Sequence, residues 1–171
     1  MGSGMETSLR YSSQFKTLRI HAKEKLRLDS KTLLQAHAEI ETGVGRPSFL
    51  CMTIRRFYPD LSASLGVGLE FNKHDKFGYN IRGKKLVALA SNGVLGINVK
   101  GRCDTDKDFK QRKAKGAVEL AWSILDFQKD QDVRIKVGYE LLEKVPYFQI
   151  RENNWTLNAD INGKWNVRFD L

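Results

Sequence analysis

The sequence predicts an all-β protein: a closed antiparallel transmembrane β-barrel of about twelve strands in up-and-down order. Three observations predict it. Apolar and polar residues alternate along most of the chain, turn signals interrupt the alternation at eleven points, and the positive charge is concentrated on one face of the alternating segments. With 171 residues and no linker or internal repeat, the chain has room for one domain.

The alternation has a period of two residues, as in a β-strand with one apolar and one polar face. In segment 61–71, Leu65, Val67 and Leu69 share a face, and Ser64 and Glu70 lie on the other. Residues 111–124 are the best candidate for a helix, but their apolar residues also alternate. We therefore predict strands throughout. Further alternating segments cover residues 95–102, 133–141, 155–161 and 165–171.

Eleven turn signals separate these segments and predict twelve strands. The Asn-Gly pairs at 92–93 and 162–163 are the strongest hairpin signals among them. The full set lies at residues 12–13, 29–30, 43–47, 59–60, 73–75, 92–93, 104–108, 129–131, 144–146, 152–154 and 162–163.

Basic residues dominate the polar face of the predicted strands. Sixteen of the 29 Lys and Arg residues lie there, with seven of the 20 Asp and Glu residues, which leaves the remaining charges balanced. The basic residues are Arg10, Arg19, Lys23, Lys25, Arg27, Arg55, Arg82, Lys84, Lys100, Arg102, Lys113, Lys115, Arg134, Lys136, Arg151 and Arg168. The acidic residues are Glu39, Glu70, Asp104, Glu119, Glu140, Asp160 and Asp170.

This sorting of charge favours a membrane pore over a β-sandwich or a soluble barrel. In a membrane barrel the apolar face meets lipid and the basic face lines a lumen, and rings of Arg and Lys are typical of anion pores. Aromatic residues on the apolar face, many near segment ends, indicate interfacial girdles. They are Tyr11, Phe71, Phe77, Tyr79, Trp122, Tyr139, Trp155, Trp165 and Phe169.

Two soluble alternatives remain open at this point: a basic β-domain that binds nucleic acid or another polyanion, and an intracellular lipid carrier. Other classes are excluded by composition. Two cysteines are too few for a disulfide scaffold, and the longest apolar run, residues 86–90, is too short for a spanning helix. No secretory signal is recognisable, and residues 1–4 before Met5 have the composition of a cloning remnant. We expect residues 5–171 to form the single barrel domain.

No catalytic or metal-binding constellation is recognisable. His21, His37 and His74 are far apart in sequence and lack ligands at metal-binding spacing, so we expect no metal site. Cys51 falls on the polar face and Cys103 on the apolar face, so we expect two free thiols. Gly66 and Gly68 lie inside a strand, where we expect them to relieve crowding or to allow the strand to bend. The chain is not predicted to be an enzyme.

Several stretches resemble the outer envelope pore protein 21 family of plastids, and the resemblance extends from Met5 to Leu171. The stretches that carry it are residues 5–10, 20–25, 57–60, 65–69, 100–104, 127–132, 149–156 (QIRENNWT) and 165–171 (WNVRFDL). The resemblance implies an anion-selective, rectifying channel in the plastid (chloroplast) outer envelope membrane. It implies that the channel passes phosphate, triose phosphates, phosphoglycerate and similar anionic metabolites. It also implies that ATP binds in the pore and reduces the current, that triose phosphates oppose this effect, and that the protein inserts without a cleaved transit peptide.

The predicted site is therefore the lumen wall, with His21 added to the sixteen basic residues. Its expected partners are anionic phosphorylated metabolites, ATP and membrane lipid, without nucleic acid and without a bound cofactor. The densest basic stripe is Arg19, Lys23, Lys25 and Arg27, with Arg10 and Arg168 beside it if the first strand pairs with the last. We expect this seam to form the tightest anion site.

Overall fold

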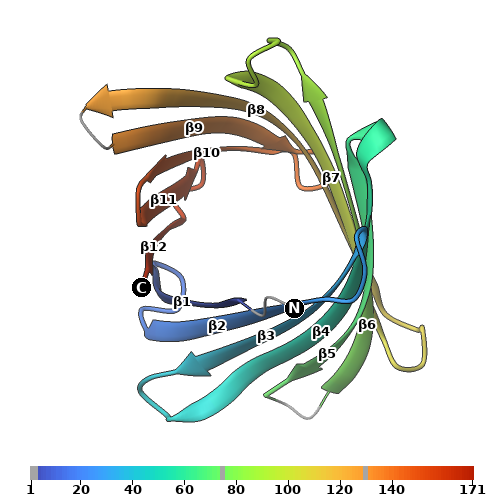
Figure 1. Cartoon of the computed structure of the whole chain (residues 1–171). Coiled ribbons are helices and arrows are strands. Elements are labelled where there is room, and N and C mark those ends of the chain that lie inside the picture. Colours follow the sequence, from blue (N-terminus) through green and yellow to red (C-terminus); the bar gives the residue numbers. More distant parts are fainter. Residues whose placement is uncertain (1–3, 74–75, 129–130) are drawn as a thin grey trace.

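Twelve antiparallel strands form one closed barrel in the computed structural model, which describes residues 4–73, 76–128 and 131–171 (Figure 1). Each strand pairs with its neighbours in the chain, and β1 pairs with β12 to close the ring. The predicted fold class and strand number are confirmed. The strands are β1 (Gly4–Ser12), β2 (Leu18–Arg27), β3 (Thr32–Glu41), β4 (Arg46–Tyr58), β5 (Ala63–Asn72), β6 (Lys76–Ala88), β7 (Leu95–Asp106), β8 (Arg112–Gln128), β9 (Gln131–Glu140), β10 (Val145–Glu152), β11 (Trp155–Asp160) and β12 (Trp165–Asp170).

Nine of the eleven predicted turns overlap described connections between strands, although some of their boundaries differ. The other two, at 73–75 and 129–131, include residues 74–75 and 129–130, which lie outside the described residues. Gly93 and Gly163 of the two Asn-Gly pairs have φ of 71° and 77°, a region that glycine adopts without strain. The turn predicted at 144–146 is wrong in position, because β10 begins at Val145 and includes Pro146. Proline is tolerated there because it occupies the start of the strand.

Two further boundaries were wrong. The strand β7 continues to Asp106, whose carboxylate accepts hydrogen bonds from the backbone N–H groups of Lys110 and Gln111 at 2.8 and 3.0 Å. Leu61, expected at the start of a strand, ends a 3₁₀ turn, η1 (Pro59–Leu61). No helix among the described residues is long and apolar enough to cross a membrane.

The distribution of side chains is inverted relative to a soluble barrel. The side chains of Ser8, Asn80 and Glu119 are at most 3% exposed, whereas Val67 and Ile81 are more than half exposed. Polar groups therefore fill the interior and apolar groups cover the outside, as expected where lipid surrounds the protein. A soluble basic β-domain or lipid carrier would leave this apolar surface in water, so neither soluble alternative fits the structure.

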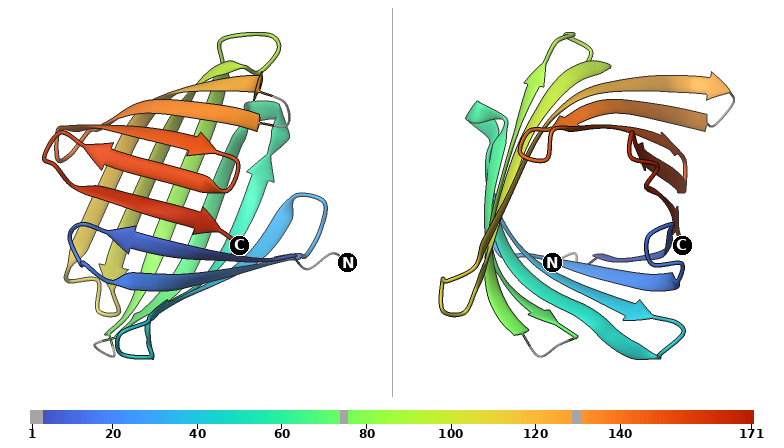
Figure 2. Two further views of the ribbon diagram at one scale, coloured as in Figure 1. Left: turned by 90° about the vertical axis from the view of Figure 1, so that its left-hand side faces the viewer. Right: turned by 180° about the vertical axis from the view of Figure 1, so that it is seen from behind.

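The barrel wall is taller on one side than on the other (Figure 2). Strands β4, β6 and β8 have 13, 13 and 17 residues, whereas β11 and β12 have six each. A spanning strand needs about 9–11 residues, so the short strands cover only part of the hydrocarbon thickness. The tall wall also carries a group of basic side chains around one cavity, described next.

Candidate functional site

All seventeen predicted site residues face the lumen. Buried polar residues mark the inner face of each strand, and the predicted residues lie on that face, either in the same strand or opposite it in the paired strand. For example, Arg10 lies two residues after the buried Ser8, and Arg168 lies opposite the buried Thr156. The prediction of which face each residue occupies therefore agrees with the register. Cys51 is buried on the inner side and Cys103 is exposed on the outer side, and both are free thiols, as predicted.

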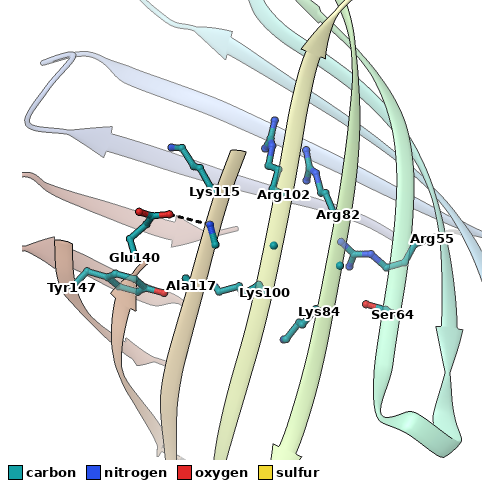
Figure 3. Close-up of a pocket in the computed structure, with 13 residues that line it drawn as sticks. Arg55, Ser64, Arg82, Lys84, Lys100, Arg102, Lys115, Ala117, Glu140 and Tyr147 are labelled. Carbon is teal, nitrogen blue, oxygen red and sulfur yellow. Dashed lines mark hydrogen bonds between the residues drawn. The ribbon is translucent and has the colours of Figure 1, made fainter. Parts of the chain in front are cut away.

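Six of these residues come together around one cavity of about 380 Å³ on the tall wall (Figure 3). Arg82 lies opposite Arg102, which in turn lies opposite Lys115, and Lys84 lies opposite Lys100. Like charges placed directly opposite each other on a sheet repel, so this arrangement favours an anion between them. We call it the basic chamber: Arg55 from β4, Arg82 and Lys84 from β6, Lys100 and Arg102 from β7, and Lys115 from β8.

Among the described residues, carboxylates pair with two of the six cations of the basic chamber. Arg102 lies 3.0 Å from Glu70 and 2.6 Å from Asp104, measured from guanidinium nitrogen to carboxylate oxygen, and Lys100 lies 2.5 Å from Glu119. The other four cations make no ion pair within the described part of the chain. Glu140 also lines the cavity, but its carboxylate accepts a hydrogen bond from the Gly116 N–H at 2.9 Å. The chamber therefore has uncompensated positive charge.

Close packing beside the chamber explains a glycine inside β5. A Cβ atom at Gly68 would lie 2.5 Å from the Thr53 hydroxyl and 2.8 Å from the carbonyl oxygen of Met52. Real Cβ atoms do not approach backbone oxygens this closely, so any other residue at position 68 would push β4 and β5 apart. Gly68 thus relieves crowding, as predicted.

The chain matches the family profile described as "Chloroplast outer envelope pore protein OEP21" over residues 7–171. It belongs to this family.

Named relatives agree with this assignment. The chain is 55% identical over 167 residues to "Outer envelope pore protein 21A, chloroplastic" of Arabidopsis thaliana, and 49% identical over 177 residues to "Outer envelope pore protein 21, chloroplastic" of Pisum sativum. Both alignments cover 98% of this chain and 100% of the relative. Among solved structures, a KdgM porin superposes with a TM-score of 0.57 at 9% identity, covering 99% of this chain and 96% of the porin, which supports the fold alone.

This member of the pore protein 21 family is accordingly a barrel channel of the chloroplast outer envelope. The predicted family, membrane and location are confirmed by the profile, the relatives and the barrel. The structure also adds lumen residues that the charge count omitted.

Tyr147 on β10 is the most prominent of these added residues. Its hydroxyl donates a hydrogen bond to the Glu119 carboxylate at 2.6 Å, and its ring lies where a Cβ atom of Gly138 would be, at 2.4 Å. The inward phase of β10 could have identified Tyr147, because it lies four residues before Arg151. The absence of a side chain at position 138 leaves room for the Tyr147 ring.

The carboxylate of Glu119 connects this tyrosine to the basic chamber. Glu119 is 3% exposed, and besides Tyr147 it contacts Lys100 at 2.5 Å and Lys136 at 3.8 Å. From the sequence, Glu119 was predicted to be one of seven acidic residues on the polar face. The structure shows that it holds two specific lysines of the wall.

The seam predicted from the sequence also exists, because β1 pairs with β12. Arg10 lies opposite both Arg19 and Arg168. Three other cations of the seam are paired with carboxylates: Arg19 with Glu39 at 2.7 Å, Arg168 with Asp170 at 2.5 Å, and Lys25 with Glu6. Glu6 is a further lumen acid that the face-by-face count omitted. The seam therefore has fewer unpaired cations than the basic chamber.

The histidines are closer together than their sequence spacing suggested. The rings of His21 and His37 lie 3.8 Å apart, on the paired strands β2 and β3, although the two residues are far apart in sequence. Sequence distance says little about strands that pair as a hairpin. His74 lies outside the described residues. Among the described residues, no group of three His, Cys, Asp or Glu side chains could hold a metal ion.

Proposed function

We propose that the lumen conducts anions in preference to cations and passes phosphate, triose phosphates, phosphoglycerate and similar metabolites. The observation that carries this proposal is the basic chamber, with four cations that have no carboxylate partner among the described residues. A phosphorylated metabolite has about two negative charges at neutral pH, and arginine binds phosphate through a planar pair of N–H donors. Several weak sites of this kind allow an anion to enter and leave.

The basic chamber is also the part of the lumen that we propose binds ATP and thereby reduces the current. Its volume, about 380 Å³, lies within the range of small-molecule sites. A triphosphate offers more negative charge to the unpaired Arg55, Arg82 and Lys84 than a triose phosphate does. Triose phosphates would then oppose ATP by occupying the same cations.

An uneven distribution of charge along the pore supports rectification. A second cavity of about 350 Å³ lies next to the basic chamber, and Glu140 and Tyr147 line both. This second cavity is lined by the carboxylates Glu140, Glu143 and Asp160 and by one cation, Lys164. An anion meets different charges when it enters from the two ends, so its current depends on the sign of the voltage.

We propose a channel rather than an enzyme or a nucleic-acid-binding protein, and one that needs no bound cofactor. The relatives are named as pore proteins. Stacking of nucleic-acid bases needs aromatic and basic side chains on one surface. Here the basic chamber faces the lumen, whereas Trp122, Tyr139 and Trp155 are exposed on the outer side.

The reversal potential of the refolded channel tests this proposal. In a planar bilayer of neutral lipid under a KCl gradient, we expect the reversal potential to move toward the chloride equilibrium potential, and ATP to reduce the current. A reversal potential near the potassium value would refute anion selectivity. Anion selectivity with no effect of ATP would refute only the nucleotide site.

Charge reversal at the seam tests the site predicted from the sequence. Arg19→Glu combined with Lys23→Glu is expected to lower the anion-to-cation permeability ratio and to weaken block by ATP, because both residues face the lumen on β2. Reversal potentials and ATP titrations of the double variant measure these effects. If a folded double variant kept both properties, the seam would not be an anion site.

A further inference from the structure

The turns at one end of the barrel carry a group of lysines that the pore does not use. This end has the connections after β1, β3, β5, β7, β9 and β11. Five exposed lysines lie in these turns and line none of the cavities described above. We call them the basic collar: Lys16, Lys73, Lys107, Lys110 and Lys144.

The lysines of the basic collar make no ion pair with any described residue. Each ion pair among the described residues is made by a lumen cation, and none by these five lysines. In the same turns, Asp108 and Glu143 are the described acidic residues. The described turns at the opposite end differ, with Lys31 as their one basic residue and Asp29 and Asp60 as their acids. The two ends of the barrel therefore differ in charge.

A girdle of aromatic side chains lies directly beside the collar. Tyr11 and Trp165 pack together with ring centroids 5.7 Å apart. Tyr79 stacks on Phe109 at 5.4 Å and meets Phe77 edge to face at 5.3 Å. All five residues are in a turn or within a few residues of one at this end. Aromatic girdles mark the level of the lipid headgroups in membrane barrels. The collar lysines therefore lie at or just beyond the headgroups.

We propose that the basic collar binds the anionic headgroups of membrane lipids and holds this end of the barrel against a negatively charged leaflet. Lysine chains can lie along the apolar surface while the ammonium group reaches the headgroup. Attraction of metabolites to the pore mouth is a weaker explanation, because the adjoining cavity is lined by Glu140, Glu143 and Asp160. This proposal rests on the membrane barrel and is independent of the proposed anion conduction.

Lipid selectivity of the reconstituted protein tests the proposal. Spin-labelled phosphatidylglycerol and phosphatidylcholine are compared for their association with the barrel in phosphatidylcholine vesicles. We expect phosphatidylglycerol to be preferred by about fivefold, the effect of roughly one lysine per headgroup, and the preference to fall at high salt. An equal association of the two lipids would overturn the proposal.

Two charge-matched variants locate the effect. The collar variant combines Lys107→Gln, Lys110→Gln and Lys144→Gln. It is expected to lose most of the preference for phosphatidylglycerol. The control changes the opposite end of the barrel by the same charge and is expected to retain the preference for phosphatidylglycerol. It combines Lys31→Gln, Arg56→Gln and Lys85→Gln. Should the first variant fail to fold, Lys16→Gln with Lys73→Gln serves the same purpose.

Conductance separates the collar from the pore. In bilayers of phosphatidylcholine alone, the collar variant is expected to keep the anion selectivity of the unmodified channel. A preference for phosphatidylglycerol that persisted in the collar variant would overturn the proposal. So would a collar variant that lost anion current in neutral lipid while its lipid preference stayed unchanged.

Discussion

Arg82→Glu combined with Lys84→Glu is expected to lower the anion-to-cation permeability ratio by at least about tenfold and to abolish block by ATP. Both side chains line the basic chamber, and neither makes an ion pair within the described residues. The double variant changes the charge of the cavity wall by four units. Two unit charges 4 Å apart interact by about 1 kcal/mol even in bulk water, so several such changes exceed a tenfold effect.

Reversal potentials under a KCl gradient measure the permeability ratio, and titrations with ATP measure the block. The control is Lys31→Glu with Arg56→Glu, which changes the net charge equally but outside the lumen. Lys31 lies in the turn after β2, and Arg56 has the outward phase of β4. If the control lost selectivity as much as the chamber variant, net charge rather than the chamber would explain the effect. A folded chamber variant with normal selectivity would refute the site.

Glu119→Gln is expected to act in the opposite direction and to increase the affinity for ATP by about fivefold. The Glu119 carboxylate pairs with Lys100 at 2.5 Å, and glutamine of the same size would leave that ammonium group free to bind a phosphate. The amide oxygen can still accept the hydrogen bond that the Tyr147 hydroxyl donates. One additional free cation contributes about 1 kcal/mol, which corresponds to about fivefold in affinity.

The half-blocking concentration of ATP, measured on single channels, tests this expectation. Tyr147→Phe is the matched control, because it removes the hydrogen bond to Glu119 and leaves the carboxylate on Lys100. It is expected to leave the affinity for ATP within about twofold of the original, because Glu119 still pairs with Lys100 and the charge of the chamber is unchanged. Weaker block by ATP in the Glu119→Gln channel would contradict the role assigned to Lys100.

The direction that each side chain faces could be derived from the sequence. In a strand, residues alternate between two faces, so once the apolar face is assigned to lipid the other must face the lumen. Every predicted lining residue, from Arg10 on β1 to Arg168 on β12, lies in that inward phase. The turns were predictable for a similar reason, because Asn-Gly pairs allow the positive φ that Gly93 and Gly163 adopt.

The errors made from the sequence have local causes. The boundary at Pro146 was misplaced because proline is common in turns but is also accepted at the start of a strand. Tyr147 was omitted because only charged residues were counted on the inner face. The contact between His21 and His37 was missed because it depends on which residues of β2 and β3 lie opposite each other.

The sequence alone thus determined the number of strands, the identity of the inner face and its excess of positive charge, because each follows from local alternation and turn chemistry. Only the tertiary structure decided which lumen residues meet. The register between strands brings Arg82, Arg102 and Lys115 into one row and places Glu119 against Lys100. Closure of β1 on β12 places Arg10 opposite Arg168. These contacts depend on which residues of two paired strands lie opposite each other, and a period of two residues contains no information about that register.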